Sequence, residues 1–191
     1  MSISSAASGL HRRQRRTVVV ATALLVTATA AGCGGEEKEP ASSPTPSATK
    51  SADAQAKAKQ EVLTVYRHYW DAQVKAYAKA DPKGSGLEKV AFGKAYSKTF
   101  AELATMKGSG TVLKGKPRIS PASPDVNVAK SPKEATLRDC VDVSDWKLVK
   151  AKSGKEVPLP KERLTKFVTD VSARTVGGKW MIVEATTGRK C

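Results

Sequence analysis

The spacing of apolar and polar residues changes once along this chain, near Gly110. Before that glycine, apolar side chains recur every three or four residues as in helices, and after it they alternate as in strands. The longest helical pattern covers residues 52–80 and stops at Asp81-Pro82, because the residue before a proline disfavours helical dihedral angles. Its broad aromatic face contains Val62, Leu63, Tyr66, Tyr69, Trp70, Gln73, Val74 and Tyr77.

A second helical pattern follows, between Ser85 and Gly108. It opens with the sequence SGLE, in which the side chains of Ser85 and Glu88 can both accept hydrogen bonds from free backbone N–H groups, as in a capping box. Gly93 is a point at which this pattern can divide into two shorter helices. One or two further helices are therefore expected after the first.

Six segments after Gly110 are rich in valine and threonine and are separated by turn residues, as strands are. They are residues 111–119, 125–129, 134–143, 146–151, 163–176 and 179–185. The sequence VGGK at 176–179 predicts a tight hairpin between the last two, because paired glycines accept positive φ angles. Helices followed by strands predict an α+β domain, with a long N-terminal helix and one or two further helices packed on an antiparallel sheet of five to six strands.

Residues 1–32 have the features of a secretory signal peptide. Four arginines precede an uncharged, mostly apolar run at 17–31, which is shorter than the roughly 20 residues that a membrane span needs. The sequence TAAGC that ends at Cys33 resembles the lipobox of bacterial lipoproteins. This resemblance implies that Cys33 is diacylated and anchors the chain to the outer face of the cytoplasmic membrane. The alternative is ordinary secretory cleavage that leaves Cys33 as a spare thiol, and the export route, general secretory or twin-arginine, stays open.

Residues 33–51 are expected to be a disordered tether, because they are rich in Pro, Ser, Thr and Glu and contain no aromatic residue. A single α+β domain is expected over residues 52–191. Removal of residues 1–32 lowers the formal net charge from +15 to +11, since four arginines and no acids are lost. Such a charge favours anionic lipid or acidic wall polymers as partners, and the alternative is a solvated lysine-rich surface. Nucleic acid is excluded, because an extracytoplasmic protein does not meet it.

The order of these elements resembles the nuclear transport factor 2-like superfamily, in which a long first helix and its neighbours pack into a strongly bent antiparallel sheet. More narrowly, the chain is similar to small secreted lipoproteins of actinobacteria. That likeness covers residues 55–191, and it rests on VYRHYWDA, on DCVD followed by DW, on GGKW and on Cys191. The superfamily contains isomerases, dehydratases and cyclases beside non-catalytic modules, so the resemblance implies a fold and not an activity.

Cys140 lies between two acids, and three roles are open to it: nucleophile, metal ligand or half of a disulfide. With Cys33 lipidated, an oxidising compartment favours a disulfide between Cys140 and Cys191. A catalytic thiol needs a base, and His68 lies on the helix face opposite the aromatic residues. Two cysteines and one outward histidine do not make a tetrahedral zinc site, so neither a metal nor a cofactor is expected.

Two polar residues interrupt the apolar pattern. Alternation along residues 135–143 puts Asp139 on the core side of its strand and Cys140 on the outer side. A buried carboxylate beside aromatic walls can act as a general acid or base, which makes Asp139 a weak catalytic candidate. The alternatives are a bulge that turns it outward or a backbone or lysine partner. Gln73 is either a satisfied core amide or part of a pocket, whose candidate residues are Tyr66, Trp70, Gln73 and Tyr77.

Three functions are compatible with these features. The leading hypothesis is a lipid-anchored extracytoplasmic binding or assembly module of the cell envelope, without catalytic activity and with a protein partner still to be identified. The second is a small-ligand carrier, or an isomerase-like or cyclase-like enzyme, that uses a pocket inside the cone-shaped domain. The third is charge-based adhesion to acidic wall polymers or lipids.

Overall fold

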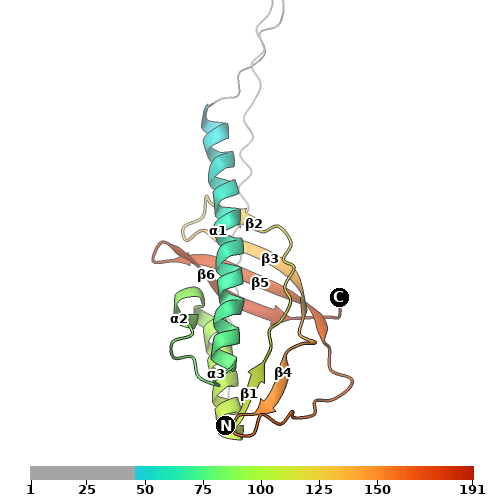
Figure 1. Ribbon diagram of the computed structural model, residues 1–191. Helices are drawn as coiled ribbons and strands as arrows, with labels where there is room; N and C mark the ends of the chain where they lie inside the picture. The colour runs from blue at the N-terminus through green and yellow to red at the C-terminus, as the bar shows by residue number, and fades with distance from the viewer. Residues whose placement is uncertain (1–45) are drawn as a thin grey trace, which may run out of the picture. The chain divides into compact units, whose positions relative to one another are not determined.

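The computed structural model describes residues 46–191, which fold into three helices and six strands (Figure 1). The helices are α1 (Pro46–Tyr77), α2 (Leu87–Val90) and α3 (Gly93–Ser109), and the strands are β1 (Thr111–Lys114), β2 (Asp125–Asn127), β3 (Glu134–Asp142), β4 (Lys147–Lys150), β5 (Lys166–Val176) and β6 (Lys179–Thr187). The protein is therefore of the α+β class. The signal peptide, Cys33 and the rest of the expected tether up to residue 45 lie outside the described residues.

Helix α1 differs from its predicted span at both ends. It begins at Pro46, so residues 46–51 of the expected tether are helical. Proline is favoured at the first helical position, where its missing N–H is not needed. The side chains of residues 50–57 are all exposed, and Ala58 is the first to be buried. At the other end α1 stops at Tyr77, three residues before the expected limit at residue 80. Ala80 then adopts a left-handed conformation, with φ 49°, that a helix cannot contain.

The six strands form two antiparallel sheets, which differs from the single sheet expected. One has the order β2-β3-β5-β6 and the other pairs β1 with β4. The predicted strand at 111–119 ends at Lys114, and beyond it the backbone forms isolated bridges to β3 at Arg118 and Pro121 instead of a continuous ladder. Pro117, Pro121 and Pro124 in this segment lack the N–H that a continuous ladder requires. This proline-rich segment therefore separates the two sheets.

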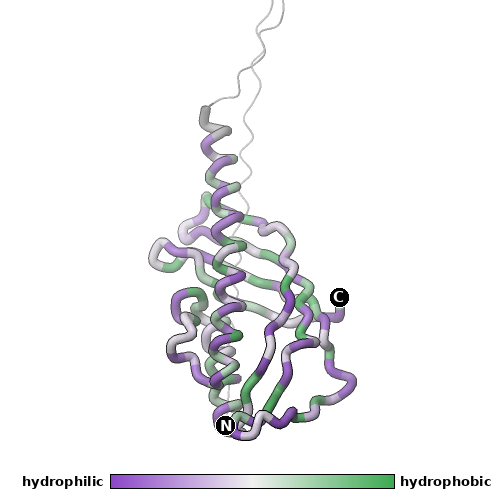
Figure 2. Tube along the Cα trace, in the orientation of Figure 1, coloured by the Kyte–Doolittle hydropathy of each residue, from purple (hydrophilic) through white to green (hydrophobic). Residues whose placement is uncertain are grey.

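The main core lies between the inner face of the four-stranded sheet and the helices. Buried and exposed residues alternate along β3, with Asp139 inside and Cys140 outside, which confirms the predicted register. Figure 2 shows that α1 alternates between hydrophilic and hydrophobic residues, as an amphipathic helix does. Tyr66, Tyr69 and Trp70 from this helix are buried, whereas His68 is exposed. The aromatic face of α1 is therefore its core face.

Strands β5 and β6 form the hairpin that the two glycines predict. Gly177 and Gly178 have φ angles of 55° and 79°, values that other residues rarely adopt. A disulfide joins Cys140 to Cys191, with the Cα atoms 6.0 Å apart. Since Cys140 is on the outer face of β3, this bond leaves the inner face of the sheet free to form the core and the cavity described next.

Candidate functional site

A cavity of about 170 Å³ lies between α1, α3 and the inner face of the sheet. Its lining residues are Tyr69, Trp70, Gln73, Tyr77, Lys98, Thr99, Glu102, Val143, Trp146, Phe167, Thr169, Ala185 and Thr187. Three of the four residues predicted for a pocket, Trp70, Gln73 and Tyr77, are among them. Tyr66 is not, and neither is the weak catalytic candidate Asp139. The aromatic face of α1 thus forms one wall, and β5 and β6 form the other.

Tyr66 and Asp139 form a closed hydrogen-bonded unit beside this cavity. The Tyr66 hydroxyl donates to Asp139 Oδ2 at 2.7 Å, and the backbone N–H of Ser120 donates to Oδ1 at 2.7 Å. Asp139 is 2% exposed, so both oxygens of a fully buried carboxyl group have partners. Burial, together with the hydrogen bond to Asp139, raises the pKa of Tyr66, and its hydroxyl therefore remains a donor. Asp139 therefore has the backbone partner that was one of the alternatives expected for it, and its carboxyl group stabilises the fold.

Trp146 lines the cavity but was not among the residues predicted for a pocket. In the sequence it was noted only as part of the motif DW, on which the likeness to secreted lipoproteins rests. It follows a turn in which Asp142 Oδ1 accepts from the Ser144 N–H at 2.9 Å. Hydrogen bonds from Ser144, and then from Arg118, hold the pKa of Asp142 well below its usual range. On the other side Gly115 packs so closely that a Cβ atom there would lie 2.0 Å from the Asp145 carbonyl oxygen. These contacts fix the turn and thereby the position of the Trp146 ring.

The ring of Trp146 completes a chain of aromatic contacts in the cavity wall. Its centroid lies 6.2 Å from that of Trp70 and 5.2 Å from that of Tyr77, and both contacts are edge-to-face. Edge-to-face packing of this kind adds roughly 0.5–1.5 kcal/mol beyond the area that the rings bury. Trp146 is thus held between rings of α1 in the aromatic part of the wall.

Three polar atoms of this wall have no hydrogen-bond partner. They are Trp70 Nε1, Trp146 Nε1 and Thr169 Oγ1, and they make up the full set of such buried side-chain atoms in the described part of the chain. Thr169 is 3% exposed, on the inner face of β5 directly opposite Asp139. Trp70 also borders a second groove, next to Pro117. An unsatisfied buried donor or acceptor costs about 1–3 kcal/mol, and each of these three atoms is closed off from solvent by its neighbours.

The mouth of the cavity carries one charge of each sign. Lys98 and Glu102 are exposed residues on successive turns of α3. The Tyr77 hydroxyl donates to Glu102, and burial together with this contact raises the pKa of Tyr77. Burial also raises the pKa of Tyr69 to about 12. Lys98 has no ion pair among residues 46–191. At neutral pH the phenols are protonated, and Lys98 is the cation at the entrance.

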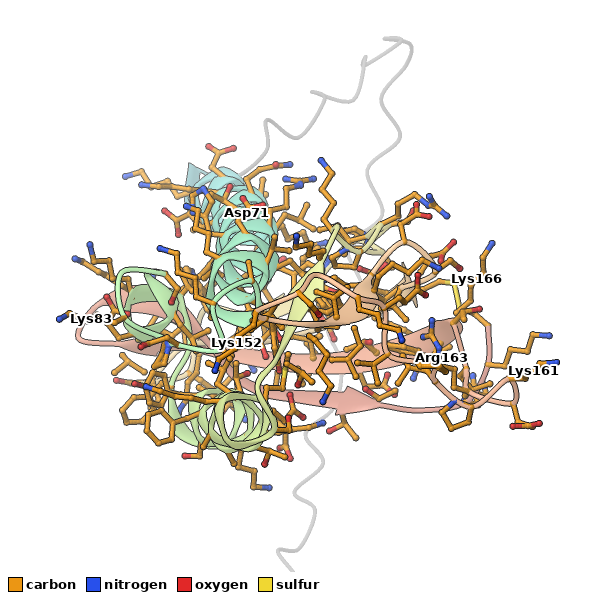
Figure 3. The ribbon with its side chains drawn as sticks, turned by 60° about the horizontal axis from the view of Figure 1, so that its bottom comes forward. Asp71, Lys83, Lys152, Lys161, Arg163 and Lys166 are labelled. Atoms are coloured by element: carbon orange, nitrogen blue, oxygen red, sulfur yellow. A yellow bond between two sulfur atoms is a disulfide. The ribbon has the colours of Figure 1, made fainter. Side chains whose placement is uncertain are left out.

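Other features of the described chain lie away from this cavity. Within residues 46–191 no group of three or more His, Cys, Asp and Glu side chains is arranged to hold a metal ion. The same region has no helix with both the length and the apolar character needed to cross a membrane. In Figure 3, Lys161, Arg163 and Lys166 lie on the segment that precedes and opens β5, on the side away from Lys83, and Lys161 extends outward. These cations belong to the outer surface and not to the cavity.

Comparisons with known proteins give distant structural likenesses, two of which are described below. No family model matches this chain, and no curated protein matches it. The crystal structure of the intermembrane space region of the chloroplast protein ARC6 is 14% identical, with a TM-score of 0.45, over 68% of this chain and 95% of that one. The crystal structure of the Kfla4162 protein from Kribbella flavida is also 14% identical, with a TM-score of 0.39, over 70% of this chain and 93% of that one. Likenesses at this level assign neither a family nor a function. A proposal about function therefore rests on the cavity.

Proposed function

We propose that this chain is a lipid-anchored, non-catalytic binding module of the cell envelope, and that it holds a small ligand in the cavity between α1, α3 and the sheet. The observation that carries the proposal is the cavity itself, in which aromatic side chains of α1 and Trp146 lie beside polar ones such as Gln73 and Thr99. Cavities with mainly apolar walls and a few well-placed polar groups are the usual form of small-molecule sites. Membership of the nuclear transport factor 2-like superfamily is part of the same proposal.

Binding is favoured over an isomerase-like or cyclase-like reaction by the state of the ionisable groups. Asp139 is occupied by two hydrogen-bond donors and does not line the cavity. Tyr77 is held in its protonated form, and it donates to Glu102, the carboxylate at the mouth. His68 is exposed, and it does not line the cavity. A catalytic site would bring an acid or base to the place where the ligand lies.

Filling the cavity tests the proposal. Ala185 lines the cavity from β6, and the neighbouring Thr186 is exposed on the opposite face of the strand. Ala185→Leu is expected to weaken fragments that bind in the cavity by tenfold or more, on the order of 1.4 kcal/mol, because the added carbons occupy their space. Thr186→Leu is the matched control and is expected to leave binding unchanged. Ligand-observed NMR with a small fragment library measures both.

Two results contradict the binding proposal. One is a library in which no fragment binds the wild-type protein at millimolar concentration. The other is a set of fragments that bind Ala185→Leu and Thr186→Leu equally well, since such fragments occupy some other surface.

The anchor has a separate test. Cys33→Ser is expected to move the protein from the membrane fraction to the soluble fraction, because a hydroxyl cannot take the thioether-linked lipid. Intact-mass measurement of the wild type is expected to show a diacylglyceryl group on a chain that begins at Cys33. Ser43→Ala, in the same segment, is the control and should stay in the membrane fraction. If the wild-type protein is soluble and unmodified, the lipid anchor is wrong, whereas the proposal that the cavity binds a ligand still stands.

The proposed partners beyond the ligand follow from charge. The exposed Lys161 and Lys166, with the partly exposed Arg163, support attraction to anionic lipid or acidic wall polymers near the membrane (Figure 3). A protein partner also belongs to the proposal. Cross-linking on native membranes, followed by mass spectrometry, identifies either kind of partner.

A further inference from the structure

We infer that the loop between β4 and β5, residues 151–165, docks on an anionic lipid bilayer by placing two leucines among the lipids. This inference rests on the lipid anchor of the proposed function and goes beyond attraction by charge, because it assigns the contact to one loop and one kind of partner. Three properties of the loop support it: its length, its exposed leucines between prolines and a turn, and its unpaired cations.

The β4–β5 loop is long, and it is fastened at both ends. Fifteen residues join the two strands, on the side of the domain opposite α2 (Figure 1). Loops of about this length without secondary structure are uncommon in compact domains and usually have a function. The Val157 N–H donates to the Leu148 carbonyl oxygen at 2.8 Å, and the Val143 N–H donates to the Thr165 carbonyl oxygen at 2.8 Å. Residues 158–164 lie between these fastened ends.

The sequence PLPKERL in the middle of the loop presents two leucines to solvent. Leu159 is 38% and Leu164 is 45% exposed, and they are two of the four large apolar side chains exposed in the described chain. Between them lies a turn in which the Arg163 N–H donates to the Pro160 carbonyl oxygen at 3.2 Å. Such a turn brings its ends within about 7 Å, so the leucines lie at one place on the surface. Pro158 and Pro160 have no N–H, so burial of this stretch leaves fewer backbone donors without a partner.

Cations accompany the leucines in this loop. The loop and the first residue of β5 contain five cations and two acids, which are Lys152, Lys155, Lys161, Arg163 and Lys166, with Glu156 and Glu162. Within residues 46–191, Lys166 is the one cation of the five that has an ion pair, with Asp142 at 3.4 Å. Leucines are stabilised when they leave water for lipid, and cations are stabilised near anionic headgroups, so a bilayer suits both kinds of side chain. An acidic wall polymer suits the cations alone.

The proposed anchor allows this contact. Twelve residues separate Cys33 from Pro46, and a chain of that length spans up to about 40 Å. Helix α1 has 32 residues and is therefore about 48 Å long. The loop follows β4, which begins next to Trp146, and the Trp146 ring contacts that of Tyr77 in the last turn of α1. The loop is thus near the end of α1 that is farther from the anchor, and its contact with the bilayer requires α1 to lie along the membrane.

Amide hydrogen exchange on the lipidated full chain tests the inference, because the anchor holds the chain on neutral and anionic vesicles alike. Residues 159–165 are expected to exchange more slowly on vesicles of phosphatidylcholine and phosphatidylglycerol in equal parts than on phosphatidylcholine alone. Lys161→Gln combined with Arg163→Gln is expected to reduce this protection about fivefold for each cation lost. Lys83→Gln combined with Lys89→Gln is the matched control and is expected to leave it unchanged. Both control lysines are exposed, Lys83 lies on the opposite side of the domain in Figure 3, and Lys89 belongs to α2.

Leu159→Ser combined with Leu164→Ser separates insertion from attraction by charge. This variant keeps every cation and is expected to lose most of the protection on anionic vesicles. Phe100→Ser is its control, since Phe100 is 50% exposed and belongs to α3, outside the loop. The control is expected to keep the protection of the wild type.

Four results overturn this inference. Equal exchange on the two kinds of vesicle overturns it and leaves the anchor and the cavity standing, and so does an equal loss of protection in the loop variants and their controls. Protection that the two serine substitutions leave intact shows a contact by charge alone, which favours an acidic wall polymer as the partner. A wild-type chain that does not float with neutral vesicles has no lipid anchor, and the proposed anchor and the inference then fail together.

Discussion

Replacing Cys140 and Cys191 together with serine lowers the free energy of unfolding by about 4 kcal/mol, which is the largest effect expected of any change considered for this protein. The disulfide joins residues 51 apart in the sequence, and a closed loop of that length restricts the unfolded chain strongly. Denaturant unfolding of the oxidised wild type, the reduced wild type and the double variant measures the effect. The reduced wild type and the double variant are expected to agree with each other.

The same experiment distinguishes a clamp from a functional thiol. Cys140 is on the outer face of β3, so the double variant is expected to keep the cavity and its ligand affinity under conditions in which it remains folded. Equal stability of the oxidised and reduced wild type would contradict the stabilising role of the bond.

Tyr66→Phe has the second largest expected effect, a loss of about 1–3 kcal/mol in the free energy of unfolding. The Tyr66 side chain is 0% exposed, and its hydroxyl is one of the two side-chain or backbone donors to the buried Asp139 carboxyl group in the described structure. Removing it leaves Asp139 Oδ2 buried without a partner, whereas the lost oxygen atom itself barely changes packing. Thermal and denaturant unfolding at neutral pH measure the loss.

A double-mutant cycle with Asp139→Asn isolates this contact. The two substitutions are expected to be non-additive, because each removes part of the same hydrogen bond. Tyr96→Phe is the control, since Tyr96 is partly exposed and its hydroxyl has no partner among the described residues. A cost for Tyr66→Phe no larger than that for Tyr96→Phe would mean that the Asp139 carboxyl group does not depend on this donor.

Local patterns predicted several features correctly, for reasons that are local themselves. The inward direction of Asp139 follows from strict alternation along β3, and the hairpin follows from the pair Gly177-Gly178. The buried face of α1 follows from helical spacing of its aromatic residues. In each case neighbours within a few positions decide the outcome, so a short stretch of sequence carries enough information.

Features that depend on distant segments could not be predicted in the same way. The division into two sheets depends on which edge the proline-rich segment before β2 meets. Trp146 lines the cavity because a turn held by Asp142 and Gly115 brings it beside α1. Thr169 lines the cavity because it lies on the inner face of β5, opposite Asp139. Neither residue has a local signal, since a tryptophan after a turn and a threonine in a strand are both ordinary.

The packing of α1 against β6 has a consequence for how the chain folds. Trp180 on β6 donates to Glu61 on α1, which is 119 residues earlier, and Ile182 belongs to the same core as Val62. Contacts between such distant segments form late and slow folding. Before β6 is in place, α1 lacks one of its packing partners, and the cavity lacks the part of its wall formed by Ala185 and Thr187. The core is therefore complete only when the last strand of the chain is in place.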